Sequence, residues 1–125
     1  MDETIALTAH AGCSGAAEVI GRLGDKWTVL VVMSLHERPR RFNDLKRRIG
    51  GVSQQMLTRT LKALERDGMV SRTVRPTVPP QVEYALTDLG RSLAEPVRAL
   101  GDWAFGNIAA IHAQREVYDR AADPR

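Results

Sequence analysis

The chain has 125 residues, of which 43% are hydrophobic and 26% are charged, and its formal net charge is +3. This length predicts one domain, and no apolar run approaches the roughly 20 residues that cross a bilayer. The single cysteine, Cys13, excludes an internal disulfide framework, and the three scattered histidines lack the spacing of zinc ligands, so we expect no metal and no cofactor. The first ten residues carry acids where a signal peptide carries cations, which predicts a cytoplasmic protein.

The charge is distributed unevenly along the chain. Residues 38–75 hold eleven Lys and Arg against three Asp and Glu, a net +8, which leaves −5 for the remainder. A basic centre between acidic flanks indicates a polyanionic partner. The alternative is a solvated surface that is rich in cations without a binding role.

The N-terminal part predicts an arm followed by two helices. Residues 1–12 have no periodicity and are expected to be a mobile arm before a single domain at 13–115. Residues 16–24 form a short amphipathic pattern that ends at Gly24. Asp25 is a plausible N-cap for the next segment, KWTVLVVMSLH, which is apolar on nearly all sides and should lie at the centre of the core. Pro39 ends it.

A helix-turn-helix pattern follows. The segment RRF is a candidate short strand, and Phe42, Leu45 and Ile49 then recur at helical spacing. Gly50 and Gly51 close that helix, and the Ser53 hydroxyl can cap a longer helix predicted at 53–67. A short helix, a tight turn and a second helix in this order are typical of helix-turn-helix units.

After Gly68 the hydrophobic period changes from 3.6 to 2. Residues 70–75 and 81–86 alternate as strands, and the loop PTVPP between them is stiffened by three prolines. A helix-turn-helix followed by a hairpin at 70–86 is the winged-helix arrangement. The predicted fold class is therefore α+β, mainly α, with a winged helix-turn-helix DNA-binding domain.

The C-terminal part predicts one long helix. Thr87 is placed to cap a helix at 88–114 whose apolar face begins at Leu89 and Leu93. Pro96 should kink this helix or split it in two. The pattern is lost after about Glu116, and residues 116–125 are expected to be a disordered tail.

The helix at 53–67 has two clearly separated faces. At about 100° per residue, the leucines lie together, and Gln54, Gln55, Thr58, Arg59 and Lys62 lie on the opposite side. Gln bonds adenine, Arg and Lys bond guanine, and Thr suits thymine in the major groove. Recognition helices read bases with their N-terminal residues. The alternative is an ordinary solvent-exposed face, because glutamine and arginine are also common helix formers.

Other cations are expected to contact the DNA backbone. Arg40, Arg41, Lys46 and Arg47 suit phosphate contacts on the element before the recognition helix. Arg72, Arg75, Thr77 and Gln81 of the wing are placed to meet the backbone or the minor groove. The candidate DNA-binding residues are Arg41, Lys46, Ser53, Gln54, Gln55, Thr58, Arg59, Lys62, Arg72, Arg75, Thr77 and Gln81.

These motifs together resemble the HxlR-type family of bacterial winged helix-turn-helix transcriptional regulators, in the MarR-like group. The matching segments are Cys13, GDKWTVLVVMSL, RRFNDLKRRIGGVSQQMLTRTLKALERDGMVSRTV, PTVPPQVEYALTDLGRSL and GDWA, in the family's order. The resemblance implies a homodimer that binds an inverted repeat in double-stranded DNA, with its N- and C-terminal helices forming the dimer interface. A repressor is the expected role.

Cys13 is a candidate sensor of oxidants or electrophiles, because the resemblance includes members that use a cysteine at this position. A thiol at the start of a helix feels the positive end of the dipole, which favours the thiolate. A Cys13–Cys13 link across a dimer and a mixed disulfide with a small thiol are both open. So is a purely structural cysteine.

Three other functions remain as alternatives. One is control by a non-covalent small-molecule effector, and another is a winged helix that serves protein–protein assembly without reading bases. The third, an enzyme, is disfavoured because the chain shows no paired carboxylates, no nucleophile–base pair and no phosphate loop. Trp27, Trp103 and Phe105 are expected to pack in the core or a dimer interface rather than to form an effector cage, and His36 is expected to be a helix-end residue.

Overall fold

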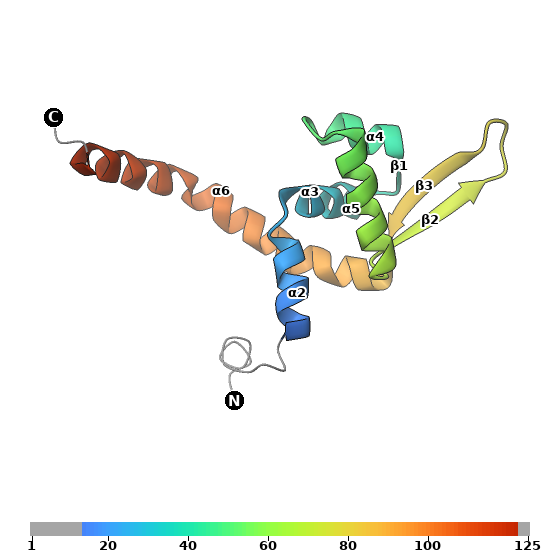
Figure 1. Cartoon of the computed structure of the whole chain (residues 1–125), viewed down its shortest axis with the longest axis horizontal. Coiled ribbons are helices and arrows are strands. Elements are labelled where there is room, and N and C mark those ends of the chain that lie inside the picture. The colour runs from blue at the N-terminus through green and yellow to red at the C-terminus, as the bar shows by residue number, and fades with distance from the viewer. Residues whose placement is uncertain (1–13, 123–125) are drawn as a thin grey trace. The chain divides into compact units, whose positions relative to one another are not determined.

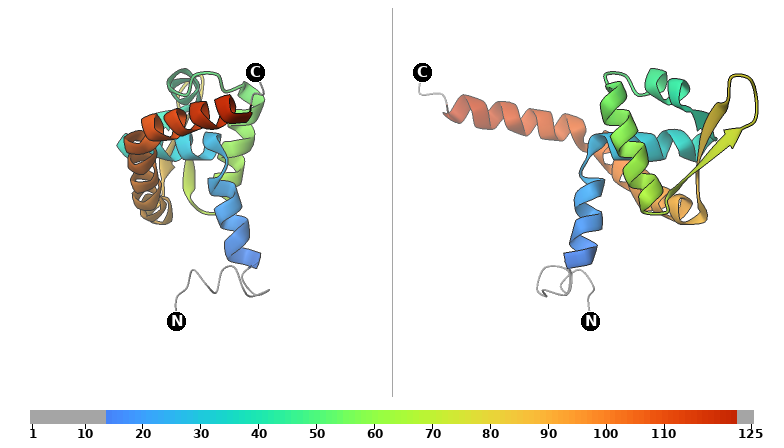
Figure 2. Two further views of the ribbon diagram at one scale, coloured as in Figure 1. Left: turned by 90° about the vertical axis from the view of Figure 1, so that its left-hand side faces the viewer. Right: turned by 45° about the vertical axis from the view of Figure 1, so that its right-hand side comes forward.

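The computed structural model describes residues 14–122, drawn as ribbons in Figures 1 and 2. The elements in chain order are α2 (Ser14–Leu23), α3 (Lys26–Glu37), β1 (Arg40–Arg41), α4 (Phe42–Arg48), α5 (Gln54–Arg66), β2 (Val70–Arg75), β3 (Gln81–Leu86) and α6 (Asp88–Ala122). By their internal contacts, these elements form two units, one ending at Ala94 and one beginning at Glu95 within α6. The predicted arm at 1–12 lies outside the described residues.

The first unit is built on α3, which begins and ends where the sequence predicts. Asp25 caps its N-terminus by accepting a hydrogen bond from the Trp27 amide at 3.0 Å. Arg38, in extended conformation, ends it just before Pro39. Val31, Val32 and Leu35 of α3 are buried in one cluster with residues from α4, α5 and the sheet. The helix therefore serves as the central support, as its apolar sequence indicates.

Strands β1, β3 and β2 form a single antiparallel sheet in that order within residues 14–122. Strands β2 and β3 pair from Val70 opposite Leu86 to Arg75 opposite Gln81, so the hairpin is the predicted wing. Strand β1 adds two residues at the outer edge of β3, with Arg40 opposite Tyr84. This confirms the winged-helix class, since a helix-turn-helix is followed directly by the hairpin (Figure 1).

A tight joint connects the end of the wing to the start of α6. The Thr87 hydroxyl accepts a hydrogen bond from the Gly90 amide at 3.1 Å and donates one to the Gly68 carbonyl at 2.6 Å. A Cβ at Gly90 would lie 2.1 Å from the carbonyl oxygen of Met69. Only glycine therefore allows the first turn of α6 to approach the Met69 carbonyl, just before β2, that closely.

The C-terminal helix is longer than the sequence pattern predicts. Helix α6 is a single 35-residue element that runs through Pro96 and continues to Ala122. The expected end near residue 114 and the expected disordered tail from 116 are therefore wrong through Ala122, and residues 123–125 lie outside the described residues. Glu116–Ala122 are mostly good helix formers that lack an apolar stripe, which explains why hydrophobic periodicity missed them. No helix among the described residues is long and apolar enough to cross a membrane.

Candidate nucleic-acid interface

The turn between α4 and α5 is fixed by backbone conformation and by one side-chain cap. Gly51 adopts a φ of 87°, a conformation that residues with a Cβ avoid. Val52 beside it is buried and anchors the turn to the core. Ser53 then caps α5 by accepting a hydrogen bond from the Met56 amide at 3.0 Å. The Ser53 hydroxyl thus holds the first turn of α5, a structural role beside any contact with DNA.

Helix α5 shows the two faces that its sequence predicts. Leu57, Leu61 and Leu64 are almost completely buried in the core cluster. Gln54, Gln55, Arg59 and Lys62 are exposed, and Thr58 is half-buried at the edge between the faces. These five polar residues form the reading face of α5. Its glutamines lie in the first turn, the end that recognition helices insert into a groove.

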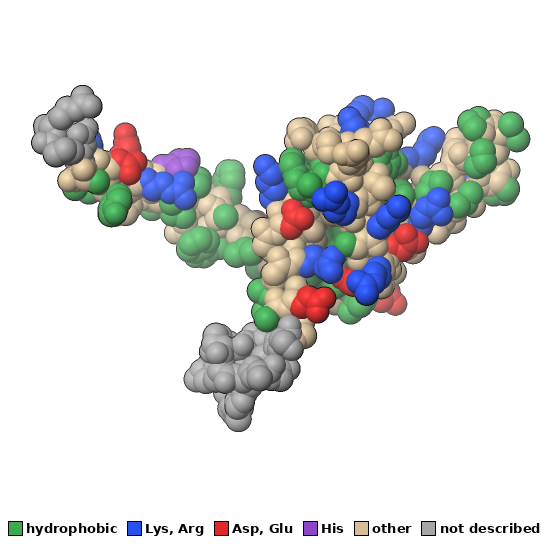
Figure 3. Space-filling view, in the orientation of Figure 1, with side chains coloured by type: hydrophobic (Ala, Val, Ile, Leu, Met, Phe, Trp, Pro, Cys, Tyr) green, Lys and Arg blue, Asp and Glu red, His purple; other side chains and the backbone are tan. Residues whose placement is uncertain are grey.

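Positive charge at the interface is smaller than the formal +8 suggests. Arg38, Arg40, Arg47, Arg48 and Arg75 all form ion pairs with carboxylates of the same chain. Six cations of this segment form no ion pair among the described residues: Arg41, Lys46, Arg59, Lys62, Arg66 and Arg72. Figure 3 shows Lys and Arg side chains spread over the face of the first unit that it presents, with Asp and Glu among them.

The predicted wing residues differ in their availability. Arg72 is exposed on β2, whereas the Arg75 guanidinium lies 3.2 Å from Glu83 of the neighbouring strand. The Thr77 hydroxyl donates to the Pro79 carbonyl at 2.7 Å and so holds the tip of the loop. Gln81 is half-buried at the start of β3. Among the described residues of the wing, Arg72 is therefore the cation that is exposed and forms no ion pair.

Three of the predicted residues come together beside the wing although they are far apart in the sequence. Arg41 of β1, Arg75 of β2 and Gln81 of β3 line one cleft of about 260 Å³ with Glu83. Strands β1 and β2 both pair with β3, and this pairing brings the three residues to the same cleft. Lys46 is exposed on α4, away from this cleft.

The expectation that Arg40 contacts phosphate is wrong. Its side chain is buried, and its guanidinium donates to the Ser34 carbonyl at 2.8 Å, to Asp44 at 2.9 Å and to Glu37 at 2.9 Å. It thus joins the end of α3 to α4 inside the protein. Because successive residues of a strand point to opposite sides, Arg41 is outside where Arg40 is inside. The sequence did contain a signal for this burial, because Glu37 and Asp44 lie three residues before and four residues after Arg40 and can both pair with it.

The cations around Asp44 perturb the titration of its carboxyl group. The hydrogen bond from Arg40 lowers the pKa of Asp44 below its usual 3.8, and the positive charges of Arg40, Arg38 and Arg47 act in the same direction. Partial removal from water opposes them. The carboxylate therefore stays ionised and holds the buried guanidinium at neutral pH.

The remaining predicted sites give fewer structural observations. Cys13 lies outside the described residues, directly before Ser14, the first residue of α2. Within residues 14–122, no group of three or more His, Asp or Glu could hold a metal ion. Trp27 packs against the core, and Trp103 and Phe105 of α6 are exposed.

A capped helix with an exposed reading face, preceded by a short helix and followed by a two-stranded wing, defines a winged-helix DNA-binding protein. Residues 22–112 match the model of the HxlR-like helix-turn-helix family. The chain belongs to this family of transcriptional regulators.

Three similar proteins agree with this assignment. The chain is 47% identical over 105 residues to YtfH of Escherichia coli K12, an uncharacterized HTH-type transcriptional regulator, covering 84% of this chain and 82% of that protein. The solved structure of ytfH from Salmonella typhimurium has a TM-score of 0.76 at 44% identity, covering 81% of this chain and 90% of that one. The structure of the redox regulator HypR in its oxidised form has a TM-score of 0.70 at 35% identity. The match covers 74% of this chain and 96% of HypR.

The Arg40 network predicts a pH dependence of stability. The pKa of Asp44 is lower in the folded state than its unfolded value of about 3.8. The ionised carboxylate therefore contributes to the free energy of unfolding above pH 3.8, and this contribution is lost as the pH falls through the lowered pKa. We expect Asp44→Asn to lower the free energy of unfolding at pH 7 and to flatten its decline below pH 4, as measured by urea unfolding. Asp102→Asn, an exposed carboxylate of α6, is the control. Equal pH profiles for wild type and Asp44→Asn would contradict this prediction.

Proposed function

We propose that this protein is a homodimeric regulator that reads an inverted repeat in double-stranded DNA through α5 and acts as a repressor by occupying its operator. The observation that carries the proposal is the reading face, which α5 leaves exposed while its leucines are buried. An α-helix fits the major groove, where each base pair presents a distinct set of donors and acceptors.

The reading face supplies side chains suited to base recognition. Gln54 and Gln55 each offer an amide that can bond adenine through two hydrogen bonds, and Arg59 can do the same with guanine. Thr58, half-buried, offers its methyl group to thymine. Lys62 lies one turn further along, where the helix leaves the groove and a cation suits a phosphate.

The other candidate residues position the domain on the duplex. Arg41 directly precedes α4, Lys46 lies exposed on α4, and Arg72 lies exposed on β2 of the wing, so all three suit phosphate contacts. Arg75 is paired with Glu83 and must exchange that partner for a phosphate. Thr77 and Gln81 contribute through the shape of the wing and its cleft with Arg41.

Substitutions on the reading face should weaken specific binding without unfolding the protein. We expect Gln55→Ala and Arg59→Ala each to cost about 1–3 kcal/mol of discrimination on a duplex selected from a random pool, because each removes a base contact from an exposed position. Fluorescence anisotropy on the selected and a scrambled duplex measures this. Glu65→Ala, an exposed residue in the last turn of α5, is the matched control.

The salt dependence of the same measurement bounds the number of phosphate contacts. Each neutralised phosphate contributes about −0.9 to the slope of log K against log salt concentration. With the six unpaired cations of residues 38–75 and Arg75 in each protomer, the slope for a dimer should be no steeper than about −13. If the selected duplex binds without salt dependence, or if both alanine variants bind it like wild type, the protein–protein alternative becomes the better interpretation.

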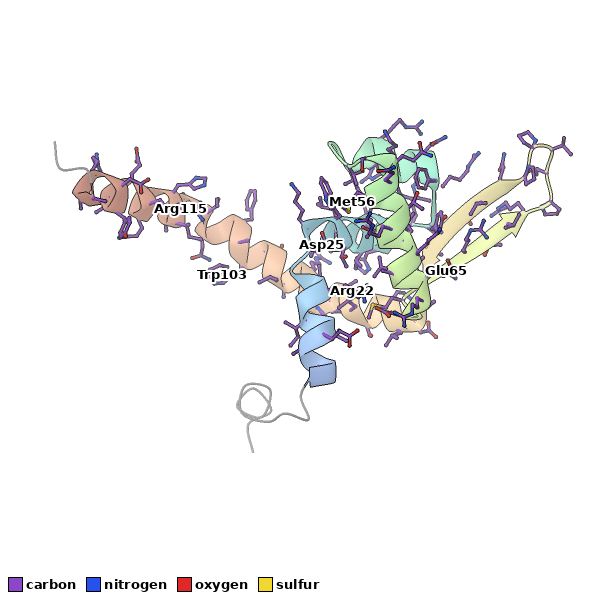
Figure 4. All side chains as sticks on the ribbon, in the orientation of Figure 1. Arg22, Asp25, Met56, Glu65, Trp103 and Arg115 are labelled. Atoms are coloured by element: carbon purple, nitrogen blue, oxygen red, sulfur yellow. The ribbon has the colours of Figure 1, made fainter. Side chains whose placement is uncertain are left out.

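Exposed apolar side chains on two helices support dimerisation. On α2, Val19 and Ile20 are 43% and 51% exposed. On α6, Leu100 and Trp103 are each 60% exposed, and Figure 4 labels Trp103. Trp103 lines a shallow apolar cleft with Ile111. Trp103 and Ile111 lie eight residues apart, on one face of the helix. Exposed apolar side chains that gather on one helix face mark interaction sites, and a two-fold dimer would match an inverted repeat.

Trp103→Glu should shift the protein toward monomers. A buried aromatic anchor in an interface is worth about 2 kcal/mol or more, which corresponds to a dimer dissociation constant roughly 30-fold higher. Sedimentation velocity over a concentration series measures it. Glu116→Gln, on the opposite side of α6, should leave the constant unchanged. A monomeric wild type would contradict the homodimer.

A redox signal at Cys13 is the second part of the proposal, and the similarity to the redox regulator HypR favours it. Helix α2 begins at the next residue, and the positive end of a helix dipole favours a thiolate. With hydrogen peroxide, two Cys13 thiols would give one disulfide and two waters. In the presence of a small thiol, a mixed disulfide is the alternative product.

Oxidation should therefore change DNA affinity in wild type and not in Cys13→Ser. We expect a change of about tenfold or more after mild peroxide treatment, reversed by a reducing thiol, as allosteric couplings of 1–3 kcal/mol produce. Anisotropy on the selected duplex provides the affinity, and non-reducing electrophoresis identifies a dimeric disulfide. If both proteins respond alike, the thiol is not the sensor, and a non-covalent effector becomes the better explanation.

A further inference from the structure

The C-terminal ends of α2 and α5 meet at one ion pair. The Arg22 Nε atom lies 2.9 Å from the Asp67 Oδ2 atom, and the two side chains are 26% and 27% exposed. Arg22 lies in the last turn of α2, and Asp67 is the C-cap of α5. Figure 4 labels Arg22, which comes from α2 near the end of α5 that carries Glu65.

Asp67 is unfavourable for α5 considered alone. A helix C-terminus carries a partial negative charge, so a carboxylate there is repelled. Asp67 nevertheless remains at the helix end, with its backbone amide bonded to the Ala63 carbonyl. Arg22 offsets this repulsion, because its guanidinium lies near the negative ends of both helices. A locally unfavourable residue is thus stabilised by a contact from 45 positions earlier in the sequence.

Helix α2 has few other attachments to the first unit. Among the described residues, the Arg22–Asp67 pair is its only side-chain hydrogen bond or ion pair with another element. Its apolar residues Val19 and Ile20 remain about half exposed. A partner or signal that moves α2 can therefore act directly on α5 through this pair.

We propose that Arg22 and Asp67 are positioning residues that couple α2 to the recognition helix and so set the placement of the reading face in the groove. This rests on the proposed function, in which α5 reads DNA. Helix α5 has 13 residues and is roughly 20 Å long, so a tilt of about 5° at its C-terminal end moves Gln54 by between 1 and 2 Å. Such a displacement breaks two-bond contacts to bases, whose donor–acceptor distances vary by only about 0.5 Å.

The test is a double-mutant cycle with neutral variants, Arg22→Gln, the isosteric Asp67→Asn and the double variant. Each single variant should weaken binding to the selected duplex by about threefold to tenfold, and the double variant should be no weaker than the worse single one. Arg22→Lys, which keeps the charge, should recover part of the loss. Glu65→Gln, an exposed acid of the same turn, should bind like wild type.

A second measurement separates positioning from a purely structural role. Asp67→Asn removes a charge that α5 disfavours, so its thermal midpoint should stay within about 2 °C of wild type while its DNA affinity falls. An affinity loss that only follows a loss of thermal stability would overturn the coupling. So would additive losses in the cycle, or single variants within twofold of wild type. If wild type selects no duplex from the pool, the proposed function itself fails.

Discussion

The burial of one leucine face on α5 is the constraint on which the structure depends. Leu57, Leu61 and Leu64 are held in the same cluster as Val31 and Val32 of α3, so the rotation of α5 about its own axis is fixed by the core. A rotation of one residue, about 100°, would bury a glutamine and expose a leucine. The free-energy cost of burying an unpaired amide therefore also determines which side chains face the groove. Packing and recognition are two consequences of the same periodicity.

A second constraint controls the orientation of the short helix that precedes α5. Arg40 is buried because three acceptors on α3 and α4 satisfy its guanidinium, and Glu37 is shared with Arg48. A buried charge is tolerated only with such partners. Arg40 and Arg48, which a count of charges along the sequence would assign to DNA binding, are paired within the protein instead. Fewer exposed cations therefore remain to contact DNA. The positive charge available to DNA thus depends more on which cations form ion pairs within the protein than on the net charge of the segment.

Most of the fold could be predicted from the sequence because its signals are local. Period, caps and glycines located α3, the turn at Gly51 and the wing, and the two faces of α5 follow from spacing alone. Three features could not be predicted this way. The distinction between Arg40 and Arg41 depends on which side of a two-residue strand faces the core, the Arg22–Asp67 pair depends on tertiary contact, and the end of α6 depends on helix propensity without an apolar stripe.

The residues that sequence reasoning missed share a physical character. Arg40 and Asp67 are charged groups in positions that are unfavourable by local rules, one in a core and one at the negative end of a helix. Each becomes favourable only through a partner on another element. Such a residue connects two elements instead of stabilising the element to which it belongs. Arg40 connects α3 to α4, and Asp67 connects α5, which carries the reading face, to α2. Local conflict in a sequence is therefore a useful guide to the residues through which the position of a recognition helix is controlled.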